Sequence, residues 1–335
     1  MNEAIDIHTH VVPENFPPYA GKGANVPWPS MVAAHACHRH VMISGKVYRT
    51  VVDGCWSVPR RIEQMGEMGI TCQAISPMPE LLSYWLPLED AKAMVRYLNE
   101  QIAEMMVQAP GRFVGLGAVP LQDVDSAIAE LEVVMKTLRF AGVEIASHVN
   151  GVSIGDARFE PFFAEAERLG AAIFVHALRP AGQDRIVGAF AEQAVCFPGD
   201  VALACASMIT GGIASRHPKL RIAFSHGGGT MAILMPRLVH AWNVFPKAKE
   251  SLPESPSTIA KRFFYDELVF EPRAVRFLVE SFGESQILVG TDYPFALGDT
   301  KPMETLAKTG LDEKILTAIT SSNARRYLGL PAAPR

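Results

Sequence analysis

The chain lacks the features that mark several large classes of protein. It has 335 residues, of which only 20% are charged, and its formal net charge is only −4. Such a small negative balance argues against a nucleic-acid binder, because those proteins normally carry a basic surface. With 49% hydrophobic residues, the chain also lacks the polar composition of a disordered protein. We therefore expect a folded protein that binds no nucleic acid.

Cysteine is scarce, and long apolar segments are missing. The five cysteines are odd in number and form no CxxC pair, so they do not resemble a disulfide framework. The first ten residues lack the basic start and the apolar run of a secretion signal. No uninterrupted apolar stretch approaches the roughly 20 residues of a membrane span. We expect a cytoplasmic protein that binds no membrane.

The sequence does contain a regular alternation of short apolar runs with longer amphipathic segments. In the latter, for example 89–109 and 123–138, apolar residues recur at spacings of three and four, which is typical of helices with one buried face. Eight such units predict a (β/α)8 TIM barrel. An open doubly wound sheet is the alternative, but no GxGxxG follows the first run. The runs span residues 4–7, 71–76, 113–119, 141–146, 171–175, 220–225, 263–268 and 286–289.

Two segments interrupt the alternation. Residues 11–53 are too long for an ordinary loop and are rich in Pro, Gly and His. Their second part, 40–53, is typical of a hairpin, so we expect a small β insertion after the first strand that covers the site. Residues 177–201 form a candidate mobile loop. Because no repeat or linker divides the chain, we expect a single domain over residues 1–335.

Histidines and an aspartate follow the predicted strands. His8 and His10 leave the first strand on the same side, since side chains along a strand alternate in direction. His176, His226 and Asp292 each follow a later run, and the carboxyl ends of barrel strands meet at the catalytic face. Because neutral imidazole binds divalent zinc, cobalt, iron or nickel, this pattern predicts a metal centre. Taken alone, the HxH pair could equally be two histidines that bind no metal.

The pattern resembles the amidohydrolase superfamily, which has HxH on strand one, histidines on strands five and six, and an aspartate on strand eight. The resemblance covers nearly the whole chain. It narrows to the decarboxylase branch, and there to the group of 2-amino-3-carboxymuconate-6-semialdehyde (ACMS) decarboxylases. The segments that resemble the decarboxylase branch are 5–10, 217–229, 290–295 and 322–328. Those closest to the ACMS group are the HxH start, where several other members of the branch have ExH, and segments 45–49, 56–65 and 120–123.

The resemblance implies roles for individual residues. His226 would act as the catalytic acid/base beside Asp292, returning a proton to carbon as CO₂ leaves, after a metal-bound hydroxide has added to the substrate. The fourth run, 141–146, has no lysine to bridge a second ion, so one ion per chain is implied. The residues that would bind this zinc, or another divalent transition metal, are His8, His10, His176 and Asp292.

Two arginines match the residues that hold substrate carboxylates in the ACMS group. They are Arg49, in the insertion, and Arg237, eleven residues after His226. The planar guanidinium suits bidentate carboxylate binding, although each arginine taken singly could form a surface salt bridge instead. In the group, the second arginine comes from the neighbouring subunit, so a homodimer is implied. Residues 177–180 depart from the group, which has a Pro-Trp pair after the histidine, and leave the exact substrate open.

We therefore expect a zinc-dependent, non-oxidative decarboxylase of a small unsaturated or aromatic carboxylic acid. A metal-dependent hydrolase of an amide, lactone or ester is the alternative, because a metal-activated water can also attack a carbonyl. A third possibility is a metal-binding protein without catalytic activity. The cluster of His35, Cys37, His38 and His40 could hold a second zinc ion, but a solvated approach to the hairpin is the simpler interpretation.

Overall fold

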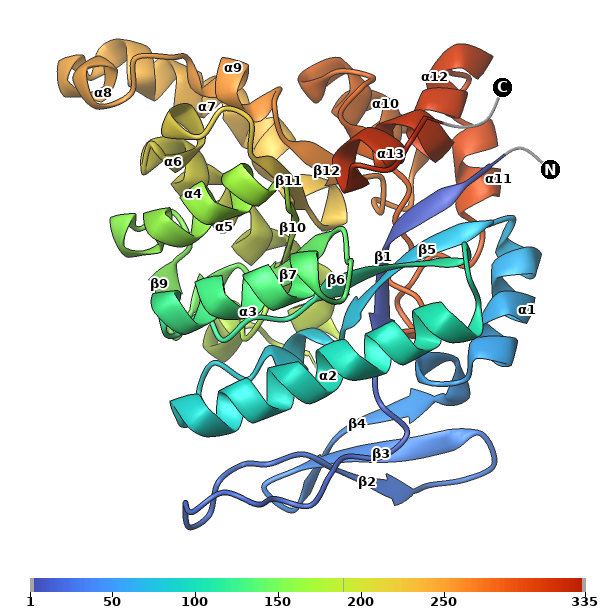
Figure 1. Cartoon of the computed structure of the whole chain (residues 1–335). Helices are drawn as coiled ribbons and strands as arrows, with labels where there is room; N and C mark the ends of the chain where they lie inside the picture. Colours follow the sequence, from blue (N-terminus) through green and yellow to red (C-terminus); the bar gives the residue numbers. More distant parts are fainter. Residues whose placement is uncertain (1–2, 189, 333–335) are drawn as a thin grey trace.

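Eight parallel strands surround a central axis in the computed structural model of the chain, which describes residues 3–188 and 190–332 (Figure 1). Spatial order follows chain order, and backbone bridges Asp6–Val289 and Thr9–Tyr293 join the last strand region to the first. The predicted (β/α)8 barrel is confirmed, and each predicted run overlaps one strand. The barrel strands are β1 (Ile5–Val11), β5 (Cys72–Pro77), β6 (Phe113–Gly117), β7 (Gly142–Ala146), β10 (Ala172–His176), β11 (Arg221–Phe224), β12 (Phe264–Asp266) and β13 (Ile287–Leu288).

The strands form largely apolar runs in the sequence because one face of each packs against the helices and the other packs inside the barrel. In β10, Ile173 and Val175 pack outward against the helices, whereas Ala172 and Phe174 pack inside the barrel. This alternation turns His176, the last residue of the strand, inward as well. In β1, the pairing with β5 shifts register between Asp6 and Thr9, and such a bulge re-aims the side chains that follow it.

Amphipathic helices enclose the barrel, as the three-and-four spacing predicts. The segments 89–109 and 123–138 become α2 and α3, and the Asp123 carboxylate caps α3 by accepting a hydrogen bond from the Ser126 amide at 2.9 Å. The helices are α1 (Val58–Met68), α2 (Leu88–Gln108), α3 (Val124–Lys136), α4 (Glu160–Leu169), α5 (Phe197–Thr210), α6 (Ile213–Arg216), α7 (Met231–Val244), α8 (Pro246–Ser251), α9 (Pro256–Ala260), α10 (Pro272–Phe282), α11 (Pro302–Ala307), α12 (Glu313–Thr317) and α13 (Asn323–Leu328).

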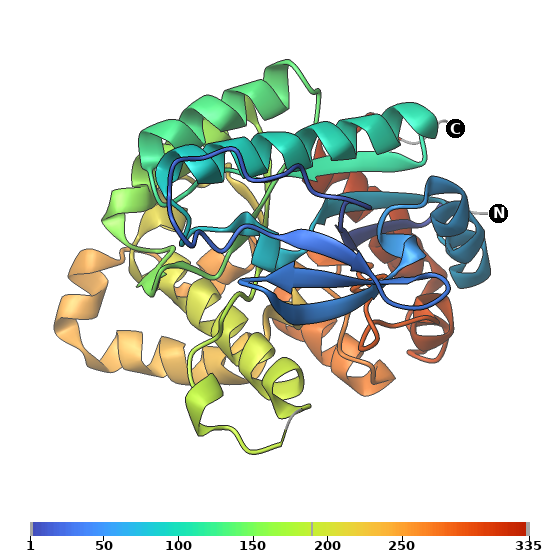
Figure 2. The same ribbon diagram turned by 90° about the horizontal axis from the view of Figure 1, so that it is seen from below.

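The insertion after β1 is a three-stranded antiparallel sheet, as expected, formed by β2 (Ser30–Ala33), β3 (His38–Ile43) and β4 (Lys46–Val52). The hairpin turns at Ser44 and Gly45, whose φ angles of 52° and 73° are left-handed. Buried side chains of the sheet pack with residues that follow β5 and with α2. Figure 2 shows the sheet lying across one end of the barrel. A second two-stranded sheet pairs β8 (His148–Val149) with β9 (Val152–Ser153).

The expectation of a loop over residues 177–201 is wrong in its second half. A π-helical turn, Glu192–Cys196, runs directly into α5. Pro198, which has no amide hydrogen to donate, lies where the π-helical turn passes into α5. By length and composition, the combined helix Glu192–Thr210 could cross a membrane, with a mean hydropathy of 1.3, but 44% of this stretch is buried inside the fold. A core helix has the same composition.

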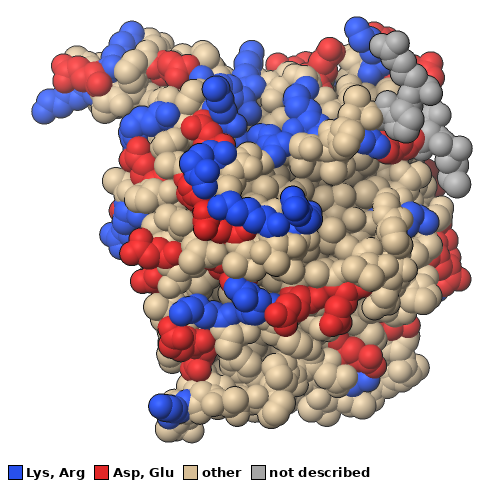
Figure 3. Space-filling view, in the orientation of Figure 1, with Lys and Arg blue, Asp and Glu red and all other residues tan. Residues whose placement is uncertain are grey.

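Charged side chains of both signs mix over the face of the molecule in Figure 3. Many of them pair locally along a helix, such as Lys136 with Glu132 at 2.6 Å. Others join neighbouring elements, such as Arg216 with Glu160. Exposed pairs of this kind contribute little stability. The charged groups that bear on function are instead the buried ones at the carboxyl end of the barrel.

Candidate metal centre and active site

Three histidines and one aspartate meet at the carboxyl end of the barrel. His8 and His10 come from β1, and His176 ends β10. Asp292 follows β13 and has a left-handed backbone, with φ at 59°. One possible ligand atom of each residue lies within 4.8 Å of the others. The structure therefore brings together the whole predicted ligand set from opposite ends of the chain.

The free atoms of these side chains point at one common space. His8 Nε2, His10 Nε2, His176 Nε2 and Asp292 Oδ1 are buried, and within the part of the chain that the structure describes they have no partner outside this group; His10 Nε2 and His8 Nε2 lie 3.1 and 3.4 Å from Asp292 Oδ1. Buried polar atoms are rarely left unpaired, because the loss of hydration costs about 1–3 kcal/mol for each. Four such atoms around one point have the donor set of a divalent transition metal.

The second nitrogen of each histidine is held in place by another part of the barrel. His8 Nδ1 lies 2.7 Å from Asp266 Oδ2, a residue that ends β12. His10 Nδ1 lies 3.2 Å from the Pro77 carbonyl, and His176 Nδ1 lies 2.8 Å from the Ala177 carbonyl. With Nδ1 donating to these oxygens, the Nε2 lone pairs face the common space, as metal-binding histidines require.

Sequence reasoning missed Asp266, which lies inside the predicted run 263–268. The structure shows that Asp266 ends β12, the position that supplies ligands on other strands. Burial lowers the pKa of His8, but the adjacent Asp266 and Asp292 outweigh this effect and raise that pKa to about 10. A metal ion at Nε2 would take the place of this proton. Asp266 Oδ1 also accepts a hydrogen bond from the Gly227 amide at 2.7 Å. Through Asp266, His8 is therefore connected to the loop after β11.

A second buried carboxyl group lies behind His10. Glu144, in β7, accepts a hydrogen bond from the Ser76 hydroxyl at 2.5 Å, and its Oε2 is 3.6 Å from His10 Nδ1. Burial raises the pKa of Glu144 to about 8, so a neutral carboxyl group fits this position. In the described residues, the fourth barrel strand offers no lysine to the centre, in line with the expectation of one ion.

His226 faces the same space from the loop after β11. Its ring lies 5.1 Å from that of His176 and 5.3 Å from that of His8, centroid to centroid. The backbone of His226 is left-handed, with φ at 54°, and its Nδ1 lies 2.9 Å from the Ser225 hydroxyl. Burial and the neighbouring His8 lower the pKa of His226 to about 4. The ring is therefore neutral near pH 7 and can accept a proton.

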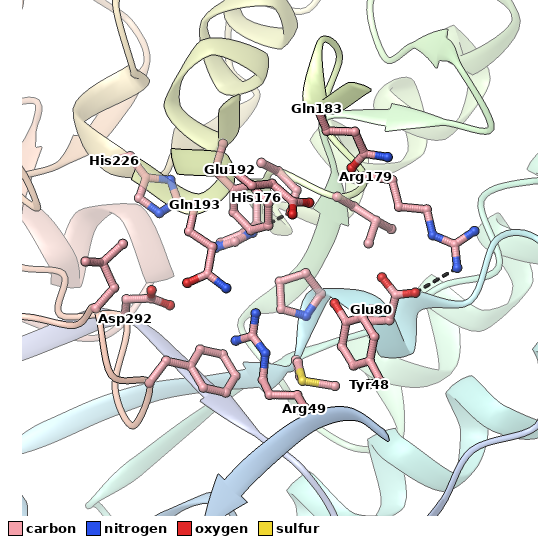
Figure 4. A pocket seen from close by; sticks show the side chains of 17 residues that line it. Tyr48, Arg49, Glu80, His176, Arg179, Gln183, Glu192, Gln193, His226 and Asp292 are labelled. Atoms are coloured by element: carbon pink, nitrogen blue, oxygen red, sulfur yellow. Dashed lines mark hydrogen bonds and ion pairs between the residues drawn. The ribbon is translucent and has the colours of Figure 1, made fainter. Parts of the chain in front are cut away.

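A pocket of about 180 Å³ opens from the centre toward the insertion and the loop after β10 (Figure 4). Arg49, in β4, reaches into it, and its guanidinium carbon lies 4.4 Å from the ring centroid of Phe295. Phe295 in turn stacks on His10 at 5.2 Å. Among the described residues, Arg49 forms no ion pair, so its charge is available to an anionic ligand in the pocket.

Arg237 does not join this group. It lies on α7 with an exposed side chain, and it is not among the residues that line the pocket. Within one chain, therefore, the structure brings six of the seven predicted site residues together around the metal centre and its pocket, and leaves Arg237 on the outer surface. The role implied for Arg237, which is to act on a neighbouring subunit, stays a prediction.

The family model for amidohydrolases matches residues 5–330 of the chain. The chain belongs to the amidohydrolase family. It is 35% identical over 328 residues to the ACMS decarboxylase of Dictyostelium discoideum, covering 97% of this chain and 91% of that protein. It is 27% identical to a γ-resorcylate decarboxylase of a Rhizobium species, covering 82% of this chain and 87% of the relative. Both relatives are decarboxylases by name, the enzyme class expected from the sequence.

Solved structures of amidohydrolase-type decarboxylases share the fold. The 5-carboxyvanillate decarboxylase of Sphingomonas paucimobilis superposes with a TM-score of 0.74 at 25% identity, covering 81% of this chain and 83% of that one. A dihydroxybenzoic acid decarboxylase from Polaromonas, solved with bound manganese, gives a TM-score of 0.78 at 20% identity, covering 99% of this chain and 98% of that one. At this lower identity, the second match shows the fold alone.

The cluster of His35, Cys37, His38 and His40 is separate from the metal-ligand group. Cys37 Sγ lies 3.4 Å from His38 Nδ1, and the rings of His35 and His38 are 4.2 Å apart. Over residues 3–188 and 190–332, however, the only group of side chains placed to hold a metal ion is the one at the barrel end. Asp6 is buried and accepts a hydrogen bond from the Thr291 hydroxyl at 2.6 Å, so it joins β1 to the segment that carries Asp292.

Proposed function

We propose that the protein is a metal-dependent, non-oxidative decarboxylase of an unsaturated or aromatic carboxylic acid. One observation supports this most directly. The four unpaired ligand atoms face a pocket that also contains the uncompensated cation of Arg49. A cation beside a metal centre suits a carboxylate substrate. The names of the relatives point to the same reaction class.

The donor set of three imidazoles and one carboxylate suits a single zinc ion, and it also accepts other divalent transition metals. Manganese is bound in the Polaromonas relative. We propose zinc as the native ion, held by His8, His10, His176 and Asp292. When bound, such an ion would lower the pKa of a coordinated water to about 7 and polarise an oxygen of the substrate.

Substrate binding and proton transfer would be carried out by side chains of the protein. Arg49 would bind the carboxylate and orient the acid toward the centre. His226, neutral near pH 7, would take up a proton and then deliver it to the carbon that loses CO₂, so that one C–C bond breaks and one C–H bond forms. Burial raises the pKa of Asp292, but the adjacent His10 and His8 outweigh this and bring it well below its usual range. Asp292 therefore stays a carboxylate beside His226.

We further propose a homodimer in which Arg237 enters the pocket of the partner subunit. The helix of Arg237, α7, and the neighbouring α5 region expose large apolar side chains: Val195, just before α5, is 57% exposed, Leu203 59% and Ile233 67%. Burying such side chains between two subunits would be favourable. We also propose a single domain over residues 1–335 in the cytoplasm, where the five free cysteines would stay reduced.

The decisive experiment supplies the zinc-loaded protein with candidate acids and measures CO₂. The acids are ACMS, 2,6-dihydroxybenzoate and 5-carboxyvanillate, which the names of the relatives suggest. We expect CO₂ release from at least one of them, and loss of that release in His226→Ala with zinc retained. His240→Ala, an exposed histidine on α7, is the control. Turnover of an ester, lactone or amide without CO₂ would instead establish a hydrolase, and zinc binding without any turnover would contradict both.

Subunit mixing tests the role of Arg237. His226→Ala and Arg237→Ala should each be inactive alone. In a mixed dimer, one of the two pockets combines an intact His226 with an intact Arg237 from the partner, so random exchange should restore about a quarter of the wild-type activity. If confirmed subunit exchange restores none, Arg237 does not act across the interface.

A further inference from the structure

The pocket has a second polar end, opposite the metal ligands. Arg179 donates a hydrogen bond to Glu80 Oε1 at 2.7 Å. In Figure 4 this pair lies across the pocket from His226 and Asp292. The Glu80 side chain is only 5% exposed, whereas that of Arg179 is 46% exposed. The proposed reaction uses neither residue, so their presence in the pocket needs another explanation.

The Arg179 side chain and backbone are both held in place. The guanidinium carbon lies 3.3 Å from the ring centroid of Trp85, so the planar group stacks on the indole. The Arg179 carbonyl lies 3.2 Å from His148 Nε2. Its φ angle is 49°, although a residue before proline, here Pro180, favours extended backbone. A non-glycine residue held in the left-handed region persists only where its surroundings fix it.

Arg179 and Leu178 separate two cavities. On one side is the pocket that contains the metal ligands, with a volume of about 180 Å³. On the other is a second cavity of about 210 Å³, which both residues also line. The rest of its wall comes from Tyr84, Trp85, His148, Asn150 and Gly151. Removal of the Arg179 side chain would therefore join the two spaces.

The charge of Arg179 is compensated within the chain. Glu80 neutralises it from a buried position, and the Tyr48 hydroxyl lies beside the same carboxylate, which contributes to a raised pKa of Tyr48 after the larger effect of burial. Arg49, by contrast, forms no ion pair among the described residues, although its charge also acts on Glu80. The two pocket arginines are thus different: one is available to a substrate carboxylate, and the other is built into the wall.

We propose that Arg179 is a specificity-determining residue whose stacked, ion-paired side chain forms the end wall of the pocket and limits the length of the substrate. This inference rests on the proposed function, since it concerns the acid that the same site accepts. A cavity of roughly 150 Å³ holds one benzene ring, so a pocket of about 180 Å³ suits a single-ring acid or an unsaturated chain of similar length. A second ring would collide with Arg179.

Binding calorimetry with two probes, benzoate and biphenyl-4-carboxylate, tests the wall on the zinc-loaded protein. The key variant is Arg179→Gly, because glycine fits the left-handed backbone and should protect folding. We expect the ratio of the two dissociation constants to shift by about 10-fold or more toward biphenyl-4-carboxylate. Benzoate affinity should change by less than about threefold. Arg185→Gly, an exposed arginine on the same loop, should leave the ratio unchanged.

Glu80→Gln tests the role of the ion pair separately. Glutamine keeps the size of the side chain, so the wall should remain and the preference for benzoate should persist. Arg179 would lose its compensating charge, however, and would attract a second carboxylate. We expect the affinity for benzene-1,4-dicarboxylate, relative to benzoate, to rise by about 10-fold. No change in this ratio would show that Glu80 does not neutralise Arg179 toward ligands.

The outcomes separate this inference from the proposed function. If Arg179→Gly leaves the ratio for benzoate and biphenyl-4-carboxylate unchanged, or weakens both equally, the wall is disproved whether or not the enzyme releases CO₂. Thermal unfolding of Arg179→Gly and Glu80→Gln at wild-type temperatures would show that a change in binding is not a folding defect. Absence of CO₂ release with the expected shift in binding would refute the decarboxylase and leave the wall intact.

Discussion

The inner and outer ends of the pocket are built in different ways. At the inner end, barrel strands supply the ligands, and a carboxylate or a backbone carbonyl fixes the outer nitrogen of each histidine. At the outer end, Arg49 comes from the insertion and Arg179 from the loop after β10. Their guanidinium groups lie on aromatic rings, Phe295 and Trp85, rather than in the barrel.

This difference separates chemistry from recognition. The inner end gathers four buried ligand atoms at one point, an arrangement that suits a bound ion. At the outer end, Arg179 is paired with Glu80, whereas Arg49 forms no ion pair among the described residues. Changes at the inner end should therefore abolish the reaction with every acid, whereas changes at the outer end should alter which acid is used. The following predictions test this separation, beginning with the largest expected effect.

Removal of a ligand should eliminate the reaction. His10→Ala deletes one of the four donor atoms, so we expect loss of bound metal and a decrease in kcat/KM of ~10³-fold or more, because the ion stabilises the transition state by several kcal/mol. Metal analysis and CO₂ release measure the two effects. His240→Ala, on the exposed face of α7, should change neither. Full activity of metal-free protein would contradict the assignment.

Removal of the charge behind His8 should have a smaller effect. Asp266→Asn keeps the shape of the side chain but weakens the contact with His8 Nδ1, and the loss of such a supporting contact typically lowers metal affinity by about 10–100-fold. Competition with a chelator measures this affinity. Asp200→Asn is the matched control, because Asp200 is also buried but contacts Ser147 and the Ala181 amide. Equal losses in both variants would argue for a general structural effect.

Substitution of the free arginine should affect substrate binding alone. Arg49→Lys keeps the charge but loses the planar donor pair, so we expect KM to rise by about 10-fold with metal content unchanged. We expect KM to change while kcat stays nearly constant, and steady-state CO₂ release measures both. A decrease in kcat together with a loss of metal would place Arg49 with the inner end instead.

The pH dependence should show the smallest effect. An ordinary histidine takes up a proton near pH 6.5, but the pKa of His226 is lowered to about 4. A lowered pKa means that the neutral, proton-accepting form persists as the pH falls, so kcat should change by less than about twofold between pH 8 and about 5.5. Metal content must be followed in parallel, because protonation of ligands releases ions. An acid limb near pH 6.5 with metal retained would contradict the lowered pKa of His226.

Much of the inner end could be predicted because its information is local. Each ligand stands directly after a short apolar run, and the barrel then brings the strand ends together regardless of their separation in the chain. Asp266 could not be predicted from the sequence because its importance depends on a contact with His8, which is 258 residues away in the chain. The pattern at the end of one strand does not reveal such a contact.

The outer end was harder to predict for the same physical reason. The departure at 177–180 was visible in the sequence, but the partner of Arg179 is Glu80, which lies 99 residues earlier. The first helical residues after this loop were also missed. Residues 192–201 lack the clear amphipathic spacing of α2, since α5 is apolar on its exposed side as well.

The closure of the barrel has a consequence during protein synthesis. The ligands His8 and His10 leave the ribosome with the first strand, whereas Asp292 follows the last one, next to the bridge between Thr9 and Tyr293. A nascent chain shorter than 292 residues carries the histidines without the carboxylate or the closing strand. Because domains fold as units while the chain emerges, the complete four-residue site exists only once translation has passed the eighth strand. Binding of an ion by all four residues therefore requires that the barrel has closed.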